Sequence, residues 1–170
     1  GGGEGRDQAA AGEDRLDRIR LRRLLGLRRS RMLALLDERT LGSIVACAKL
    51  LRMPMGAVIF RQHQEIVLGV DDCLYVLLSG SIKVMVTGPD DAMVELDVLR
   101  AGSVFGEAVF LGTTRRRTAT LVAASRCTVA SLKRPSVERY VLSNPQVRDQ
   151  MKRAAAERML QRVSLLGHAL

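Results

Sequence analysis

A single carboxylate and a cluster of arginines lie close together in residues 105–121, which read FGEAVFLGTTRRRTATL. Glu107 stands ten residues before Arg117, the last of three consecutive arginines. A guanidinium can bind a phosphate through two parallel hydrogen bonds, and an ionised carboxylate accepts hydrogen bonds from sugar hydroxyls. The apolar stretch between Gly106 and Gly112 predicts one helical turn whose first N–H groups could bind an anion. The segment therefore suggests a pocket for a ligand with one phosphate, a ribose and an apolar base.

Two plainer interpretations of this segment are open from its spacing alone. The arginines could be solvated in a surface loop, where charged side chains contribute little to the stability of the fold. Glu107 could also form an ion pair with one of these arginines. The elements around the segment have to distinguish a ligand site from these alternatives.

The composition indicates one domain with a core built from aliphatic side chains. The chain has 170 residues, of which 47% are hydrophobic and only 3% aromatic, without tryptophan. No apolar run approaches the roughly 18 residues of a membrane span, and no hydrophobic signal segment lies near the start. Three cysteines without metal-ligand spacing indicate reduced thiols in the cytoplasm, and two histidines are too few for a zinc or histidine-based catalytic site.

Hydrophobic periodicity divides the chain into helical, β-rich and again helical segments. Residues 1–13 lack periodicity and are expected to form a flexible tail, whereas apolar spacing over 14–51 predicts helices. Short β-rich runs between turn residues indicate an antiparallel sandwich or barrel in 52–134. Its candidate strands are 57–60, 73–80, 81–88, 92–99, 118–125 and 127–132. In 135–170 we expect a short helix and then a long helix that begins at Pro145.

The net charge of +9 includes a basic stripe over residues 15–31, where eight arginines accompany one acid, Asp17. Such a stripe could contact nucleic acid or an acidic membrane surface. We favour the plainer interpretation, which is a solvated helix face or one that packs against a neighbouring segment absent from this sequence.

Several motifs along the chain match the order of motifs in a known family. Residues 105–107 (FGE) and 117–121 (RTATL) match F-G-E and R-(A/R/T)-A-(T/S)-V. Residues 54–59 (PMGAVI) and 74–81 (LYVLLSGS) are similar to P-G-E-x-I and L-Y-x-I-x-S-G-x. With the final Ala-rich helical stretch, residues 54–166 resemble the cyclic nucleotide-binding domain of kinase regulatory subunits, cyclic nucleotide-gated channels and bacterial catabolite activators.

The resemblance implies an α+β fold with an antiparallel β-roll, a jelly-roll-like barrel, over 52–134. N-terminal helices precede the roll, and a pair of C-terminal lid helices follows it in 135–170. The family's phosphate-binding cassette corresponds to residues 105–121, and we call this segment the cassette below.

The resemblance also assigns roles to individual side chains. Arg117 would bind the cyclic phosphate and Glu107 the ribose 2′-hydroxyl, while Arg158 and Met159 would cover the base. Thr118 stands where channel members contact the phosphate and, with cGMP, the guanine. The implied ligand-binding residues are Phe105, Gly106, Glu107, Ala108, Val109, Arg116, Arg117, Thr118, Ala119, Arg158 and Met159.

The chain departs from the family pattern in three places. In the entry motif, Gly56 keeps the glycine of P-G-E, but Ala57 stands in place of its acid. The cassette is one residue longer between Glu107 and its arginine, so Arg116 competes with Arg117 for the phosphate. The sequence TATL that follows keeps the family register and favours Arg117. The segment 61–74 has about three extra residues and carries His63 where a glycine is common.

These observations predict a regulatory binding domain without catalysis, whose ligand is cAMP or cGMP and which needs no other cofactor. Bound nucleotide would favour the state with the lid closed, because only that state covers the base. We expect a slight preference for cAMP, since no acid near Arg158 could hold the N–H groups of guanine.

The regulated effector and its setting are predicted by analogy. The stretch NPQVRDQMKRAAAERM favours an ion channel, with a kinase regulatory subunit as the alternative. The domain is expected in the cytoplasm, at the cytoplasmic face of the membrane for a channel, and residues 14–51 could form a homo-oligomer contact. Nucleic-acid binding is not expected, because no helix-turn-helix follows the lid. A basic adaptor acting through 15–31 and a scaffold with a degenerate pocket remain as rivals.

Overall fold

The computed structural model of the chain describes residues 3–26, 33–112 and 115–168. The elements in order are α1 (Gly3–Gly26), η1 (Leu33–Leu35), α2 (Glu38–Cys47), β1 (Lys49–Met53), β2 (Val58–Phe60), β3 (Cys73–Ser79), β4 (Ile82–Thr87), β5 (Met93–Leu99), β6 (Val104–Phe105), η2 (Glu107–Leu111), β7 (Thr120–Ala123), β8 (Cys127–Lys133), α3 (Arg134–Val137), η3 (Glu138–Leu142) and α4 (Pro145–His168). Helices therefore stand on both sides of a β-rich centre, as the sequence predicts.

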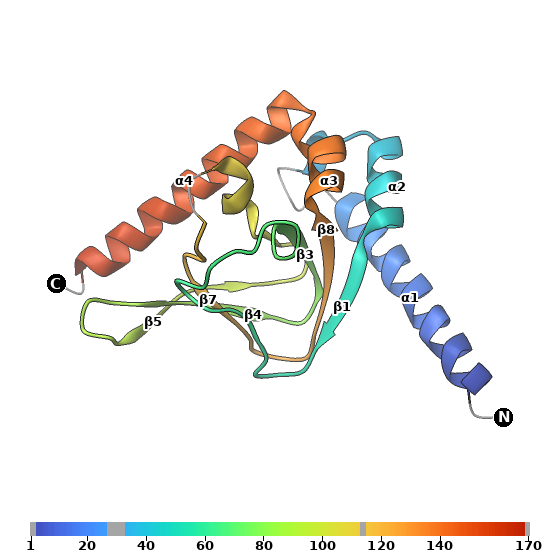
Figure 1. Cartoon of the computed structure of the whole chain (residues 1–170), viewed down its shortest axis with the longest axis horizontal. Coiled ribbons are helices and arrows are strands. Elements are labelled where there is room, and N and C mark those ends of the chain that lie inside the picture. The colour runs from blue at the N-terminus through green and yellow to red at the C-terminus, as the bar shows by residue number, and fades with distance from the viewer. Residues whose placement is uncertain (1–2, 27–32, 113–114, 169–170) are drawn as a thin grey trace.

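The strands form two four-stranded antiparallel sheets, which make up the predicted β-roll (Figure 1). One sheet has the order β1-β8-β3-β6, and the other has the order β2-β7-β4-β5. In the first sheet Leu74 pairs with Leu132, and in the second Ile82 pairs with Ala123. The α+β fold class is confirmed.

Strand β3 explains why its sequence, CLYVLLS, is an almost continuous apolar run. Successive side chains of a strand point to opposite faces of the sheet, so alternate residues of β3 pack into two different hydrophobic cores. Tyr75 and Leu77 pack inside the roll with side chains from the second sheet. Leu74 and Val76 face outward and are covered by the helices. A strand buried on both faces has no polar alternation.

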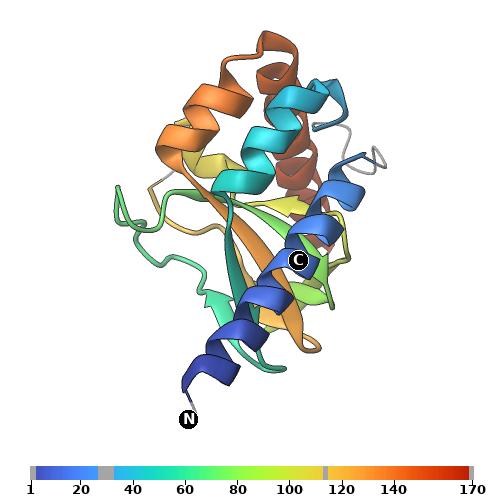
Figure 2. The same ribbon diagram turned by 90° about the vertical axis from the view of Figure 1, so that its right-hand side faces the viewer.

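The helices form a layer over the outer face of the first sheet (Figure 2). Leu21 of α1 and Ile44 of α2 are almost fully buried there, and so are Val147 and Met151 near the start of α4. The rest of α4 extends along the roll beside η2 (Figure 1). The two ends of the chain therefore share one hydrophobic core.

The basic stripe lies partly on α1, and its one acid is buried. Asp17 is 7% exposed and accepts hydrogen bonds from Arg52 at 2.5 Å and from Arg20 at 3.5 Å. Arg18 donates to the backbone oxygen of Val45 at 2.5 Å. Asp17 and Arg18 therefore contact β1 and α2 of this chain, and not an absent segment. Residues 27–31 lie outside the described part.

The structure corrects two expected boundaries. The flexible tail expected at 1–13 is helical from Gly3 onward, because α1 runs without interruption to Gly26. The helix expected to reach residue 51 ends at Cys47, and residues 49–53 form β1 against β8. Ala48 has extended backbone angles, and Leu50 then pairs with Ala130 in the sheet. Sheet pairing, which local apolar spacing does not reveal, decides this boundary.

Candidate functional site

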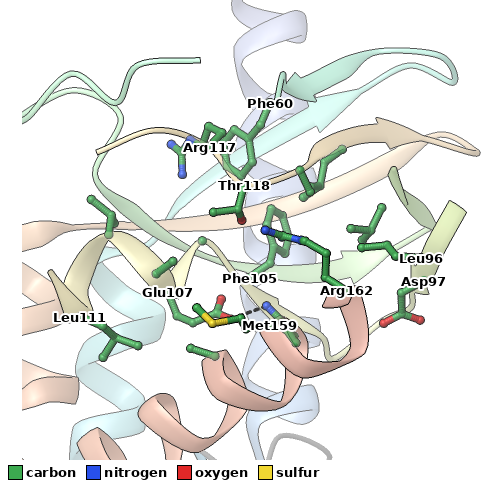
Figure 3. Close-up of a pocket in the computed structure, with 18 of the residues that line it drawn as sticks. Phe60, Leu96, Asp97, Phe105, Glu107, Leu111, Arg117, Thr118, Met159 and Arg162 are labelled. Carbon is green, nitrogen blue, oxygen red and sulfur yellow. Dashed lines mark hydrogen bonds and ion pairs between the residues drawn. The ribbon is translucent and has the colours of Figure 1, made fainter. Parts of the chain in front are cut away.

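A cavity of about 460 Å³ lies between the β-roll and α4. Its walls come from the cassette, from β2, β4 and β5 of the second sheet, and from the middle of α4 (Figure 3). Cavities of this size hold small organic ligands. The lining residues that the argument uses are Phe60, Val84, Leu96, Asp97, Phe105, Glu107, Arg117, Thr118, Met159 and Arg162.

Two backbone hydrogen bonds hold Arg117 at the entrance to β7. The N–H of His63 donates to the oxygen of Arg117, and the N–H of Arg117 donates to the oxygen of Gln64, both at 2.8 Å. His63 has a φ of 71°, in the left-handed region that glycine adopts most easily. His63, which stands where the family commonly has a glycine, therefore adopts the backbone conformation that glycine favours.

The side chain of Arg117 is buried at 8% exposure inside the cavity wall. Its guanidinium lies 3.6 Å above the centre of the Phe60 ring, and Nη2 donates to the backbone oxygen of Asp71 at 2.7 Å. Burial lowers the pKa of this guanidinium. In the part of the chain that the structure describes, no carboxylate forms an ion pair with it.

Three aromatic rings form the support beneath Arg117. Tyr75 stacks on Phe105 with ring centres 5.1 Å apart, and Phe60 meets both rings edge to face. Burial raises the pKa of Tyr75 to about 12, so its phenol is neutral at ordinary pH. The chain has five Phe and Tyr residues in total, and three of them are here. This concentration gives the arginine a rigid apolar base with a negative ring face toward the charge.

Glycine at position 106 allows the cassette to approach β3. Gly106 has a φ of 82°, and a Cβ there would lie 2.8 Å from the Tyr75 ring and 2.9 Å from the Cys73 oxygen. The turn places Glu107 as the first residue of η2, where its side chain is only 5% exposed. The predicted single turn after the FGE motif is thus present.

Glu107 forms its ion pair with α4. Arg158 Nη1 lies 2.5 Å from Glu107 Oε1, and Arg158 Nη2 donates to the oxygen of Val104 at 2.8 Å. The alternative in which Glu107 pairs with an arginine of its own cassette is therefore wrong. Arg158, which the resemblance assigns to the base, instead contacts the carboxylate assigned to the ribose.

The structure separates the two candidate phosphate arginines. Arg117 is buried, whereas Arg116 is exposed at the cavity rim and directs Nη1 to the His63 oxygen at 3.4 Å. Thr118 is exposed toward the cavity, and Met159 lines it with 60% of its side chain exposed. The other expected site residues, which also line the cavity, are Phe105, Gly106, Ala108, Val109 and Ala119.

Sequence reasoning missed several lining residues. Phe60 ends the predicted strand 57–60 and lines the cavity. Tyr75 belongs to a quoted motif and supports Arg117 from behind the lining. The aromatic character of both residues, in a chain so poor in aromatics, was an available signal. Leu96 and Asp97 of β5 and Arg162 of α4 lie outside any motif. Arg162 follows Arg158 by one helical turn, so its place on the same helix face could be deduced only once Arg158 was placed.

Arg134 connects the cassette to the first C-terminal helix. Its Nε lies 2.6 Å from Oδ2 of Asp72, whose side chain is 4% exposed. Its guanidinium also lies 4.8 Å from the centre of the Phe110 ring in η2. Burial opposes ionisation of Asp72, but the hydrogen bonds from Arg134 and Gly69 outweigh it and lower the pKa of this carboxyl.

A family model described as "Cyclic nucleotide-binding domain" matches residues 50–144, which are more than half of the chain. The chain belongs to this family. The match includes the β-roll, the cassette and the short helices before α4, so the cassette side of the cavity lies within the matched residues. No curated protein matches the sequence of this cyclic nucleotide-binding domain.

Solved structures share the fold. The regulatory domain of Toxoplasma gondii PKA, crystallised with cAMP, is 24% identical with a TM-score of 0.63, and the match covers 73% of this chain and 44% of that one. The N-terminal domain of a Streptomyces coelicolor transcriptional regulator is 25% identical with a TM-score of 0.61 (80% and 93% covered). The Thermus thermophilus Catabolite Activator Protein is 23% identical with a TM-score of 0.66 (82% and 63% covered). This chain spans less than half the length of the Toxoplasma chain.

Proposed function

We propose that this domain binds a cyclic nucleotide, cAMP or cGMP, in the cavity beneath α4 and thereby regulates an effector. The observation that carries the proposal is Arg117, a buried guanidinium that contacts an aromatic ring and a carbonyl. Among the described residues, no carboxylate lies within ion-pair distance of it. Burying an uncompensated charge costs free energy. An anion bound in front of Arg117 would offset this cost by pairing with the guanidinium.

The remaining parts of the nucleotide find chemically suitable neighbours. The Thr118 hydroxyl lines the cavity beside Arg117 and can donate to a phosphate oxygen. Glu107 keeps acceptor capacity beyond its hydrogen bond to Arg158, because an ionised carboxylate has about four acceptor sites, and this capacity suits the ribose 2′-hydroxyl. Val84 and Leu96 supply an apolar wall for the base.

Regulation follows from the position of α4. The helix is joined to the cassette through Arg158 and Glu107, and it lines the same cavity as Arg117. A nucleotide that contacts both the cassette and α4 favours the state in which they are together. The likeness to kinase regulatory domains and transcription regulators supports a coupled effector.

The channel setting expected from the α4 sequence stays a prediction. Among the residues that the structure describes, no helix combines the length and the apolar character needed to cross a bilayer. The structural relatives reported above are kinase and transcription regulators, and the kinase alternative is compatible with them.

Calorimetric titration of cAMP and cGMP into the purified chain tests the proposal, with 5′-AMP as a control for the cyclic phosphate. The wild-type chain should bind the nucleotide saturably. Arg117→Ala should weaken the binding free energy by about 2–5 kcal/mol, because the phosphate loses its buried partner. Arg116→Ala, which removes a neighbouring exposed guanidinium, should lose much less. Absence of binding by the folded wild-type chain, or an equal loss in both variants, would contradict the proposal and leave the scaffold interpretation.

A further inference from the structure

Arg162 is a cavity arginine whose donors the protein does not fully use. It projects from α4 toward the wall that carries Phe105 and Thr118 (Figure 3). Its Nε is buried and has no hydrogen-bond partner in the described part of the chain. Burial lowers the pKa of this guanidinium.

Arg117 and Arg158, the arginines assigned above to the phosphate and to Glu107, differ from Arg162, and Arg116 lies exposed at the rim with Nη1 directed to the His63 oxygen. Arg117 is held by Phe60 and a carbonyl, and Arg158 is held by Glu107 and another carbonyl. A buried donor without an acceptor is unfavourable, so a ligand that presents acceptors to Arg162 gains affinity. Arg162 therefore offers a buried donor that a ligand in the cavity could satisfy.

The position of Arg162 indicates which part of a nucleotide it meets. In the proposed arrangement Arg117 holds the phosphate and Glu107 the ribose, which leaves the base between α4 and β5. Arg162 lies one helical turn beyond Arg158, and it lines the cavity together with Leu96 of β5. Its guanidinium can therefore contact the edge of the base.

Purine edges differ in the acceptors that they offer to a guanidinium. Guanine presents O6 and N7 side by side, which matches two parallel N–H donors, whereas adenine presents N7 beside the N6 amino donor. We propose that Arg162 reads the O6 and N7 edge of a purine and makes this domain selective for cGMP over cAMP. This inference rests on the proposed function, and it reverses the slight preference for cAMP expected from the sequence.

Asp97 is the strongest competing determinant, because a carboxylate could accept the N6 amino group of adenine. Its side chain is exposed on β5, and Oδ1 already accepts the N–H of Val98 at 2.8 Å. An exposed acceptor that water also satisfies discriminates weakly, while the buried Nε of Arg162 has no such substitute. The difference in burial favours guanine.

Affinities of four nucleotides test the inference: cGMP, cIMP, cAMP and 7-deaza-cGMP. cIMP keeps O6 and N7 but lacks the N2 amino group of guanine, and 7-deaza-cGMP lacks N7. We expect cGMP and cIMP to bind about 5- to 150-fold more tightly than cAMP, the range of one bidentate base contact, and 7-deaza-cGMP to lose part of this advantage.

Variants assign the preference to the side chain. Arg162→Met, which keeps an unbranched apolar stem, should remove most of the preference, and Arg162→Lys, which keeps the charge without the fork, should restore little of it. Arg153→Met on an exposed position of the same helix is the matched control and should keep it.

The outcomes separate this inference from the proposed function. Binding of cyclic nucleotides without a preference for cGMP, or with a preference that survives Arg162→Met, overturns the inference alone. Affinity of cIMP equal to that of cAMP would show that the N2 amino group is read instead, and it also overturns the inference. If no nucleotide binds the folded wild-type chain, both proposals fail.

Discussion

Arg158 and Glu107 join α4 to the cassette across 51 residues of sequence, with 2.5 Å between Nη1 and Oε1. The carboxylate side of this pair is 5% exposed and the guanidinium side 44%. The buried acid therefore depends on the helix for compensation of its charge. The position of α4 and the charge environment of the carboxylate proposed to bind the ribose are therefore linked through Glu107.

Arg158→Ala should release the second half of α4 from the roll. The change leaves the buried carboxylate of Glu107 without its charged partner, which should lower the free energy of unfolding by about 1–3 kcal/mol. Hydrogen exchange of the amides beyond residue 155 should become faster. Arg153→Ala, an exposed arginine on the same helix, is the control, and identical exchange in both variants would show that the pair does not hold the helix.

Phe60→Leu should weaken nucleotide binding through Arg117. The ring centre lies 3.6 Å below the guanidinium, and a cation–π contact contributes about 0.5–2 kcal/mol, so affinity should fall about 2- to 30-fold. Phe110→Leu is matched, because Phe110 lies below Arg134 outside the cavity. It should reduce stability without changing affinity. Equal affinities of the two variants would speak against this role of Phe60.

Gly106→Ala and Gly112→Ala separate backbone strain from steric contact. Both glycines have positive φ, 82° and 68°, which costs an alanine about 1–2 kcal/mol. Only at Gly106 does the added Cβ meet the Tyr75 ring, so this variant should lose a further 1–3 kcal/mol, approximately. Urea denaturation of both variants measures the difference. A larger loss at Gly112 would be inconsistent with the packing described.

Asp72→Asn should change the response of the protein to acid. The pKa of Asp72 is lower in the folded chain than the unfolded value of about 3.9, so the ionised group stabilises the fold above that pH. This contribution is lost as the pH falls through the folded pKa. Asp72→Asn should therefore be less stable than wild type at pH 7, and the difference should shrink below about pH 4.

Urea unfolding at several pH values measures this convergence. Glu95→Gln, which changes an exposed carboxylate in β5, is the control and should differ little from wild type at any pH. The free energy of unfolding of Asp72→Asn could instead differ from that of wild type by a constant amount from pH 7 to pH 3. That result would exclude the proposed contribution of the Asp72 carboxylate.

Most of the β-roll could be predicted because local signals specify it. Alternation, turn residues and the motifs placed six of the eight strands, and the cassette motif identified Glu107 and Arg117 as partners in one cavity. β6 was missed because two residues, Val104 and Phe105, carry no periodic signal. β1 was missed because its apolar spacing also fits a helix, and only pairing with β8 distinguishes them.

The contacts of α4 were the least predictable part of the site. Motifs placed Arg158 on the helix, but they do not specify how the helix is rotated against the roll. That rotation is set by burial of Val147 and Met151 in a core shared with α1 and α2. It brings Arg158 to Glu107 and directs Arg162 into the cavity, and both contacts depend on long-range packing.

The burial of α4 at one end makes the helix a lever. Val147 and Met151 are fully buried, and Arg158 follows Met151 by seven residues, or about 10 Å along the axis. A tilt of roughly 10° about Met151 would displace Arg158 by about 2 Å, enough to break its bond to Glu107. The same tilt would carry His168, about 25 Å from the pivot, through roughly 4 Å. A small change at the cavity is thus more than doubled at the far end of the helix.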